Sequence, residues 1–150
     1  MRKIVVVMLF LALCSTPMLA ARPEAVAAVE FLAGTVGGYA AGTLGAVTLS
    51  SAFAAGSTGW ESLSRAILGA VVGFSAGTIV GSSLGVIGAA SLFGVEGNVG
   101  LCFLGAASGT GMMLLISLAF ESSDSIFPLA PPVAAACAVA GFTLGASSQK

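Results

Sequence analysis

The charged residues of this chain lie at or between the ends of long uncharged stretches, and this placement constrains the fold more than any other feature. Charged side chains make up only 7% of the 150 residues, whereas about a quarter of a soluble domain is charged. A charge at the centre of a bilayer costs several kcal/mol, so membrane-spanning sequences keep charges at their edges. We therefore expect a protein whose partner is the lipid bilayer. The net charge of −1, without a basic cluster, argues against binding to nucleic acid.

The first 21 residues have the three parts of a secretory signal peptide. Two basic residues precede an apolar run from Ile4 to Leu13, and small residues follow at Ala20 and Ala21. We interpret residues 1–21 as a cleaved signal peptide, with an uncleaved signal anchor as the alternative, and residues 22–150 as a helical membrane domain. The segment predicts a location in a membrane of the bacterial cell envelope, without distinguishing the inner from the outer membrane.

Four apolar stretches follow, near residues 31–53, 66–93, 99–120 and 129–147. About 20 helical residues, at 1.5 Å each, cross a hydrocarbon core of about 30 Å. The last stretch is the weakest candidate because prolines near its start shorten the apolar helix. Transmembrane strands would require alternating apolar and polar residues, which these stretches lack. The sequence therefore predicts an all-α fold, a small multi-pass helical membrane bundle.

Glycines repeated at intervals of four are the clearest motif in the chain. The second stretch carries Gly69, Gly73, Gly77, Gly81 and Gly85, which we call the glycine ladder. Residues four apart share one face of a helix, so the ladder predicts a groove without side chains in which another backbone can lie close. In lipid, such close packing and Ser or Thr hydrogen bonds hold helices together.

The other stretches repeat this spacing over shorter distances. The remaining predicted helix-packing residues are Gly34, Gly38, Gly42, Gly105, Gly109, Gly141 and Gly145, and Gly37, Ala41 and Gly45 form a second row in the first stretch. Through Gly34–Gly42 and Gly69–Gly85, the chain resembles the glycine-zipper class of small bacterial membrane and envelope proteins. The resemblance implies tight helix packing and often oligomers, but it carries over no catalytic or ligand-binding residue. The last stretch, with its prolines, departs from the motif.

The residues that usually perform catalysis are missing or scattered. The chain has no histidine, which excludes Ser-His-Asp and Cys-His catalysis and histidine metal sites in their usual forms. Phosphate-binding loops with a Gly-Lys-Ser/Thr ending are also missing. We therefore predict that the protein is not an enzyme and has no catalytic, cofactor or metal site. Cys102 and Cys137 lie in apolar stretches and are interpreted as small buried residues rather than a disulfide.

Glu30 is the acidic residue closest to membrane depth in the predicted spans. An intramembrane carboxylate is a candidate for handling ions or protons. The interpretation that we favour from sequence is an interfacial residue near the positive end of a helix dipole, where acidic residues are favourable.

Two functions remain open at this point. The first is a structural or interaction protein of the envelope membrane that packs or self-associates through its glycine faces, as a homo-oligomer or with a membrane protein partner. The second is a small pore or transporter component with a polar path lined by Ser75, Thr78, Ser82, Ser83 and Ser108. Hydroxyl groups in packed helices more often bond to nearby backbone groups, which favours the first function.

Overall fold

The computed structural model describes residues 24–119 and 127–147. The elements are α2 (Glu24–Ala54), α3 (Gly59–Leu92), α4 (Val99–Ala119), the 3-10 helix η1 (Phe127–Leu129) and α6 (Ala130–Ser147). These residues contain no strand, so the all-α prediction is confirmed. The predicted signal segment, 1–21, lies outside the described residues.

Among the described residues, three helices are long and apolar enough to cross a membrane, which supports the membrane prediction. They are Ala25–Ala54, Gly59–Leu92 and Val99–Ser117, while the apolar helix Ala130–Leu144 is shorter, as expected of the weakest candidate. Two helices begin earlier than the predicted spans, α2 at Glu24 rather than near residue 31 and α3 at Gly59 rather than near residue 66. The charged residues that end an apolar stretch are good helix formers, so they do not end a helix.

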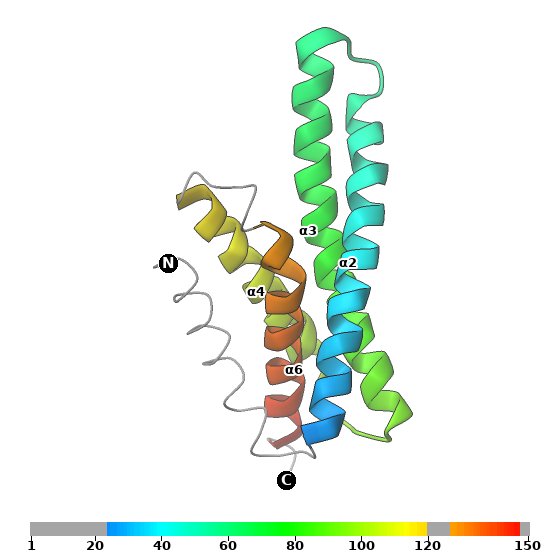
Figure 1. Ribbon diagram of the computed structural model, residues 1–150, viewed down its shortest axis with the longest axis vertical. Helices are drawn as coiled ribbons and strands as arrows, with labels where there is room; N and C mark the ends of the chain where they lie inside the picture. Colours follow the sequence, from blue (N-terminus) through cyan, green and yellow to red (C-terminus); the bar gives the residue numbers. More distant parts are fainter. Residues whose placement is uncertain (1–23, 120–126, 148–150) are drawn as a thin grey trace.

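The long antiparallel hairpin of α2 and α3 dominates the structure, and α4 and α6 pack together against one part of it (Figure 1). The hairpin helices contain 31 and 34 residues, or about 46 and 51 Å at 1.5 Å per residue. A hydrocarbon core of about 30 Å is shorter than either helix. In a membrane the hairpin therefore tilts or extends beyond the core.

Glycines with positive φ form the two connections on either side of α3. Gly56 and Gly59, with φ of 79° and 66°, form the turn after α2, and Gly94, with φ of 63°, follows α3. Side chains other than glycine rarely adopt this left-handed region, which makes glycine a common terminator of helices. Both connections lie between the predicted apolar stretches, 31–53, 66–93 and 99–120.

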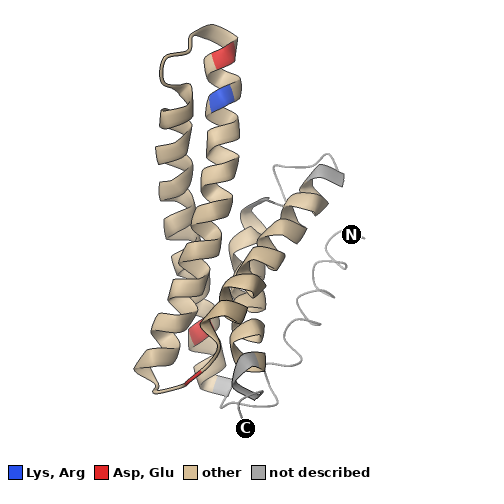
Figure 2. Ribbon diagram, turned by 180° about the vertical axis from the view of Figure 1, so that it is seen from behind, with Lys and Arg blue, Asp and Glu red and all other residues tan. Residues whose placement is uncertain are grey.

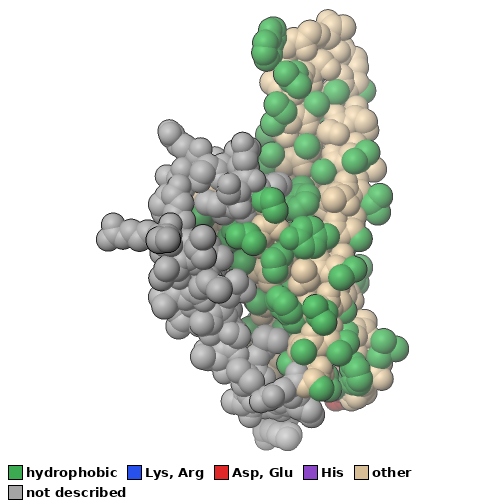
Figure 3. Space-filling model, viewed as in Figure 1, with side chains coloured by type: hydrophobic (Ala, Val, Ile, Leu, Met, Phe, Trp, Pro, Cys, Tyr) green, Lys and Arg blue, Asp and Glu red, His purple; other side chains and the backbone are tan. Residues whose placement is uncertain are grey.

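Small residues form the interior of the structure, and large apolar residues cover its exterior. The buried apolar side chains are mostly alanine, with Phe142 and Met113 the largest. Leu84 and Leu104, by contrast, are 57% and 66% exposed, and apolar side chains are spread along the whole hairpin in Figure 3. A water-soluble protein has the opposite distribution. The outer surface is therefore suited to lipid.

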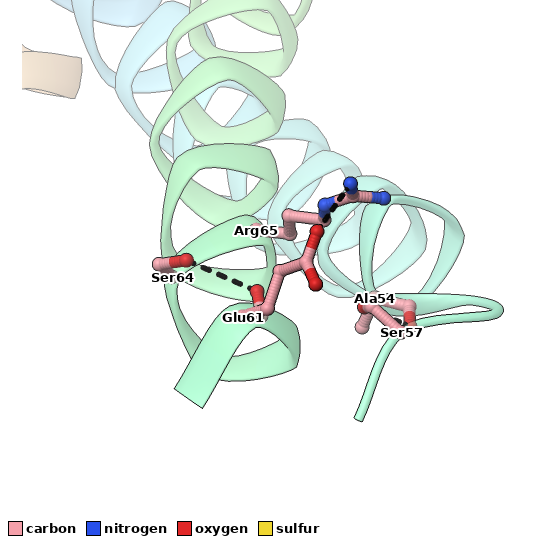
Figure 4. A network of polar contacts seen from close by, with 5 residues as sticks. All are labelled: Ala54, Ser57, Glu61, Ser64 and Arg65. Atoms are coloured by element: carbon pink, nitrogen blue, oxygen red, sulfur yellow. Dashed lines mark hydrogen bonds and ion pairs between the residues drawn. The ribbon is translucent and has the colours of Figure 1, made fainter. Parts of the chain in front are cut away.

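The charged residues of the described part of the chain lie in segments towards the two ends of the hairpin (Figure 2). At the α2–α3 turn, Arg65 Nη2 lies 2.6 Å from Glu61 Oε1 in an exposed ion pair one helical turn apart. Figure 4 shows this pair beside the hydroxyl of Ser64, which donates to the Glu61 carbonyl. Trp60, next to the pair, is 85% exposed. This end of the hairpin has the aromatic and charged residues typical of a membrane interface.

Candidate helix-packing site

The glycine ladder of α3 lies directly against the backbone of α2. A Cβ atom built on any of its five glycines would come within 3.0 Å of a carbonyl oxygen of α2, closer than real Cβ atoms approach other atoms. The pairs are Gly69 with Leu49, Gly73 with Gly45, Gly77 with Ala41, Gly81 with Gly37 and Gly85 with Ala33. Each step of four along α3 matches a step of four backwards along α2. The two helices thus keep one antiparallel register over five contacts.

The two small-residue rows of α2 have different neighbours. The row Gly37, Ala41 and Gly45, which sequence reasoning placed second, faces the ladder. The row Gly34, Gly38 and Gly42 faces side chains instead: a Cβ on Gly34 would lie 2.8 Å from Val86 Cγ2 of α3 and 3.1 Å from Ala135 Cβ of α6. The row Gly34, Gly38 and Gly42 therefore meets both α3 and α6.

The contact between α4 and α6 uses the same kind of approach. A Cβ on Gly105 would lie within 3.0 Å of the Cys137 carbonyl oxygen, and one on Gly141 within 3.0 Å of the Leu101 carbonyl oxygen. At Gly109 a Cβ would lie 3.0 Å from Ala134 Cα. Gly145 lies in α6, but its side-chain surroundings fall outside the described residues.

Not every glycine within these helices touches another helix. A Cβ built on Gly88 of α3 or on Gly111 of α4 would meet no atom within 4 Å. Neither residue belongs to the predicted packing set. Gly88 and Gly111 therefore provide controls within the same helices. A glycine inside a helix lowers stability through its backbone entropy at every position, but these two have no close neighbour on another helix.

Two buried hydroxyl groups of α3 fit against the glycines of α2. The side chains of Thr78 and Ser82 are fully buried, and among the described residues their oxygens have no hydrogen-bond partner. A Cβ on Gly42 would lie 2.8 Å from Thr78 Oγ1, and one on Gly38 would overlap Ser82 Oγ. Both hydroxyls therefore occupy space that only glycine leaves open on α2.

The five hydroxyls of the predicted polar path do not share one environment. Thr78, Ser82 and Ser83 are buried, whereas Ser108 is on the outer surface. Ser75, Ser83 and Ser108 donate hydrogen bonds to carbonyl oxygens of their own helices, at 2.8 Å each. Three of these five hydroxyl groups thus bond to the backbone of their own helix, as hydroxyl groups in packed helices commonly do.

The side chain of Glu30 is fully buried within the bundle, which sequence reasoning did not indicate. Glu30 lies in the second turn of α2, which begins at Glu24, and its position at a membrane interface stays a prediction. Ala27, Glu30 and Gly34 are all buried on α2, and their spacing of three and four places them on one helical face. The sequence held a usable signal, because Glu30 stands four residues before Gly34 and so continues the row Gly34, Gly38 and Gly42.

Sequence reasoning assigned no partner to Tyr39. Its hydroxyl donates a hydrogen bond to the carbonyl oxygen of Pro128 in η1, 89 positions later in the chain. The bond ties α2 to the segment that leads into α6. No pattern in the sequence relates two residues so far apart.

The two cysteines behave as expected of small residues in apolar helices. Cys102 is buried and Cys137 is half-buried, and no disulfide joins them. The Cys102 thiol lies 3.8 Å from the carbonyl oxygen of Ser83 and donates to it, which links α4 to α3.

Comparisons with known proteins identify no family for the chain. No protein-family model matches the sequence, and neither a curated protein nor a solved structure is significantly similar to it. The function therefore has to be argued from the geometry of the helices and their contacts.

Proposed function

We propose that this chain is a structural or interaction protein of a bacterial cell-envelope membrane, built as a bundle whose helices pack through glycine faces. The observation that carries the proposal is the run of five ladder glycines, each opposite a carbonyl group of α2. Lipid tails are as apolar as leucine, so apolar side chains alone do not drive membrane helices together. Close backbone approach supplies dispersion contacts and weak Cα–H to oxygen bonds instead.

The position of the ladder limits how such a protein can assemble. All five ladder glycines have their close neighbours in α2 of the same chain. The ladder therefore serves the fold of one molecule, and a second copy or another membrane protein would meet a different surface. In this proposal the ladder glycines pack the helices of one chain, and association with a second copy or another protein uses other residues.

The experiment compares the native chain with Gly77→Leu and Gly88→Leu by size-exclusion chromatography with light scattering in mild detergent. We expect the native chain and Gly88→Leu to elute as the same discrete species. Gly77→Leu should lose folded protein to aggregates, because its side chain has no room against Ala41. A native oligomer that Gly77→Leu converts into a stable, folded monomer would instead put the ladder between subunits and contradict the proposal.

The alternative is a small pore or transporter component, and the buried hydroxyls of Thr78 and Ser82 are the feature in its favour. Both side chains, however, pack against glycines of α2. Flux of small ions through vesicles containing the purified chain separates the two functions. A structural protein produces no flux above empty vesicles, whereas a pore produces a flux that Ser82→Ala changes.

A further inference from the structure

One side of the α2–α3 hairpin is left uncovered by the other described helices. α6 contacts Gly34 and Gly38 of α2 through Ala135 and Pro131, and α4 and α6 lie together to the left of the hairpin in Figure 1. The row on the other flank of α2 is exposed, and so is the matching row of α3. We call these eight residues the open face: Val36, Ala40, Leu44 and Thr48 of α2, and Leu68, Val72, Ala76 and Val80 of α3.

The residues of the open face are paired across the two helices. The ladder glycine Gly77 lies against Ala41 of α2. Each residue turns a helix by about 100°, and the two helices run antiparallel, so the residues that precede this pair point to the same side. They are Ala76 and Ala40, and the other ladder pairs place their preceding residues level in the same way. The level pairs of the open face are Val80 with Val36, Ala76 with Ala40, Val72 with Leu44, and Leu68 with Thr48.

The open face is apolar and carries no charged residue. Its one hydroxyl, on Thr48, donates to carbonyl oxygens of α2 itself, to Leu44 at 2.9 Å and to Gly45 at 3.1 Å. The larger apolar side chains of the face are 44–67% exposed. Together the eight residues expose roughly 600 Å², and each partner in a stable interface buries about 600–1,000 Å². The face is therefore large enough to hold one partner.

Ala40 and Ala76 form a low region within the open face, because the level pairs on either side of them consist of valine and leucine. In lipid, small residues where helices cross let two backbones approach closely, and this close packing holds membrane helices together. Another hairpin can therefore come nearest at these two alanines.

A membrane favours a second copy of the chain as that hairpin. Two copies inserted in the same direction hold their open faces at the same depth, so a two-fold axis along the membrane normal brings each level pair opposite its equivalent. Such a contact uses the same patch on both copies and is complete with two. α4 and α6 do not obstruct it, because they contact the other flank of the hairpin.

We propose that the open face binds the open face of a second copy, so that the chain forms a two-fold symmetric dimer centred on Ala40 and Ala76. The inference rests on the proposed packing function, and it names the surface that remains for assembly once the ladder is used within one chain. Leu84 lies one helical turn beyond Val80, outside the contact, and faces lipid.

Disulfide crosslinking of the full chain in lipid vesicles tests the proposal. Ala40→Cys and Ala76→Cys each place a thiol at the centre of the contact, and Ser108→Cys, on the exposed surface of α4, is the control. The native chain, with its own cysteines, is the blank. Copper phenanthroline oxidises two neighbouring thiols to a disulfide, and non-reducing gel electrophoresis separates dimer from monomer.

We expect a disulfide-linked dimer for Ala40→Cys and for Ala76→Cys that persists when the vesicles contain more lipid per protein. Ser108→Cys should give no more dimer than the native chain. Adding Ala76→Leu to Ala40→Cys should abolish the dimer, because the larger side chain fills the low region of the face. Adding Ser108→Leu to Ala40→Cys, an enlargement on α4, should leave the dimer in place. Circular dichroism establishes that the variants are folded.

Two results would overturn the proposal. If the alanine variants crosslink no more than Ser108→Cys, or only in proportion to the density of protein in the vesicles, the open face contacts lipid or another protein rather than a second copy. If Ser108→Cys gives the dimer instead, the copies meet through α4. Neither result bears on the ladder, because failure of the packing function would appear as a Gly77→Leu chain that elutes like Gly88→Leu.

Discussion

Replacing Gly77 with alanine should destabilise the α2–α3 hairpin, although alanine is the better helix former. The added Cβ would overlap the carbonyl group of Ala41 and also lie 2.9 Å from Gly42 Cα. These are backbone atoms, which cannot rotate away as a side chain can. The helices must therefore separate or shift, and overpacking of this kind costs about 2–3 kcal/mol.

Gly88→Ala is the matched control, because it makes the same chemical change in the same helix where no atom lies within 4 Å. Without a steric penalty, alanine should leave the free energy of unfolding unchanged or raise it by up to about 1 kcal/mol. Reversible unfolding in mixed micelles, followed by circular dichroism, measures both variants. The account predicts a loss of stability at Gly77 and no loss at Gly88, so equal effects at the two positions would refute the close contact.

The second large effect is expected at the contact between α4 and α6. Gly105→Ala would place its Cβ against the carbonyl group of Cys137 and 3.2 Å from Ala138 Cα. We expect a loss of about 2–3 kcal/mol in the free energy of unfolding, for the same reason as at Gly77. The same micelle unfolding experiment measures it.

Gly111→Ala is the control in α4, since a Cβ there meets nothing within 4 Å. The double variant Gly77→Ala with Gly105→Ala adds information, because the two glycines have no close neighbour in common. Their effects should add to within about 0.5 kcal/mol. A Gly105→Ala variant as stable as Gly111→Ala would show that α4 and α6 are not held at this distance.

The fold class could be predicted because lipid imposes simple rules on a sequence. Charges at the ends of apolar stretches, and the lack of alternation within those stretches, were enough to expect helices. The helix boundaries could not be predicted from the same rules. Glu30 and Glu61 lie outside the apolar stretches but belong to α2 and α3. Hydropathy indicates which residues can lie in lipid, and it does not indicate where the hydrogen-bonded helical backbone begins or ends.

The spacing of the candidate site could be read from the sequence, but its partners could not. Intervals of four identify a face, and the repeat is the same at every step, so nothing in the pattern selects which row of α2 meets the ladder. In the structure Gly37 and Gly45 face the ladder, whereas Gly34 and Gly38 also contact residues of α6. The contact between Tyr39 and Pro128 likewise depends on the assembled helices.

The most direct test of the central claim, a membrane bundle with small residues inside and large apolar residues facing lipid, is the accessibility of spin labels in vesicles. Labels replace Leu84, Leu104 or Trp60, all exposed in the structure, and collisions with oxygen and with a water-soluble nickel complex are measured by electron paramagnetic resonance. The account predicts that oxygen, which concentrates in lipid, reaches the labels at Leu84 and Leu104 while nickel reaches the label at Trp60. Equal access of nickel to all three positions would contradict it.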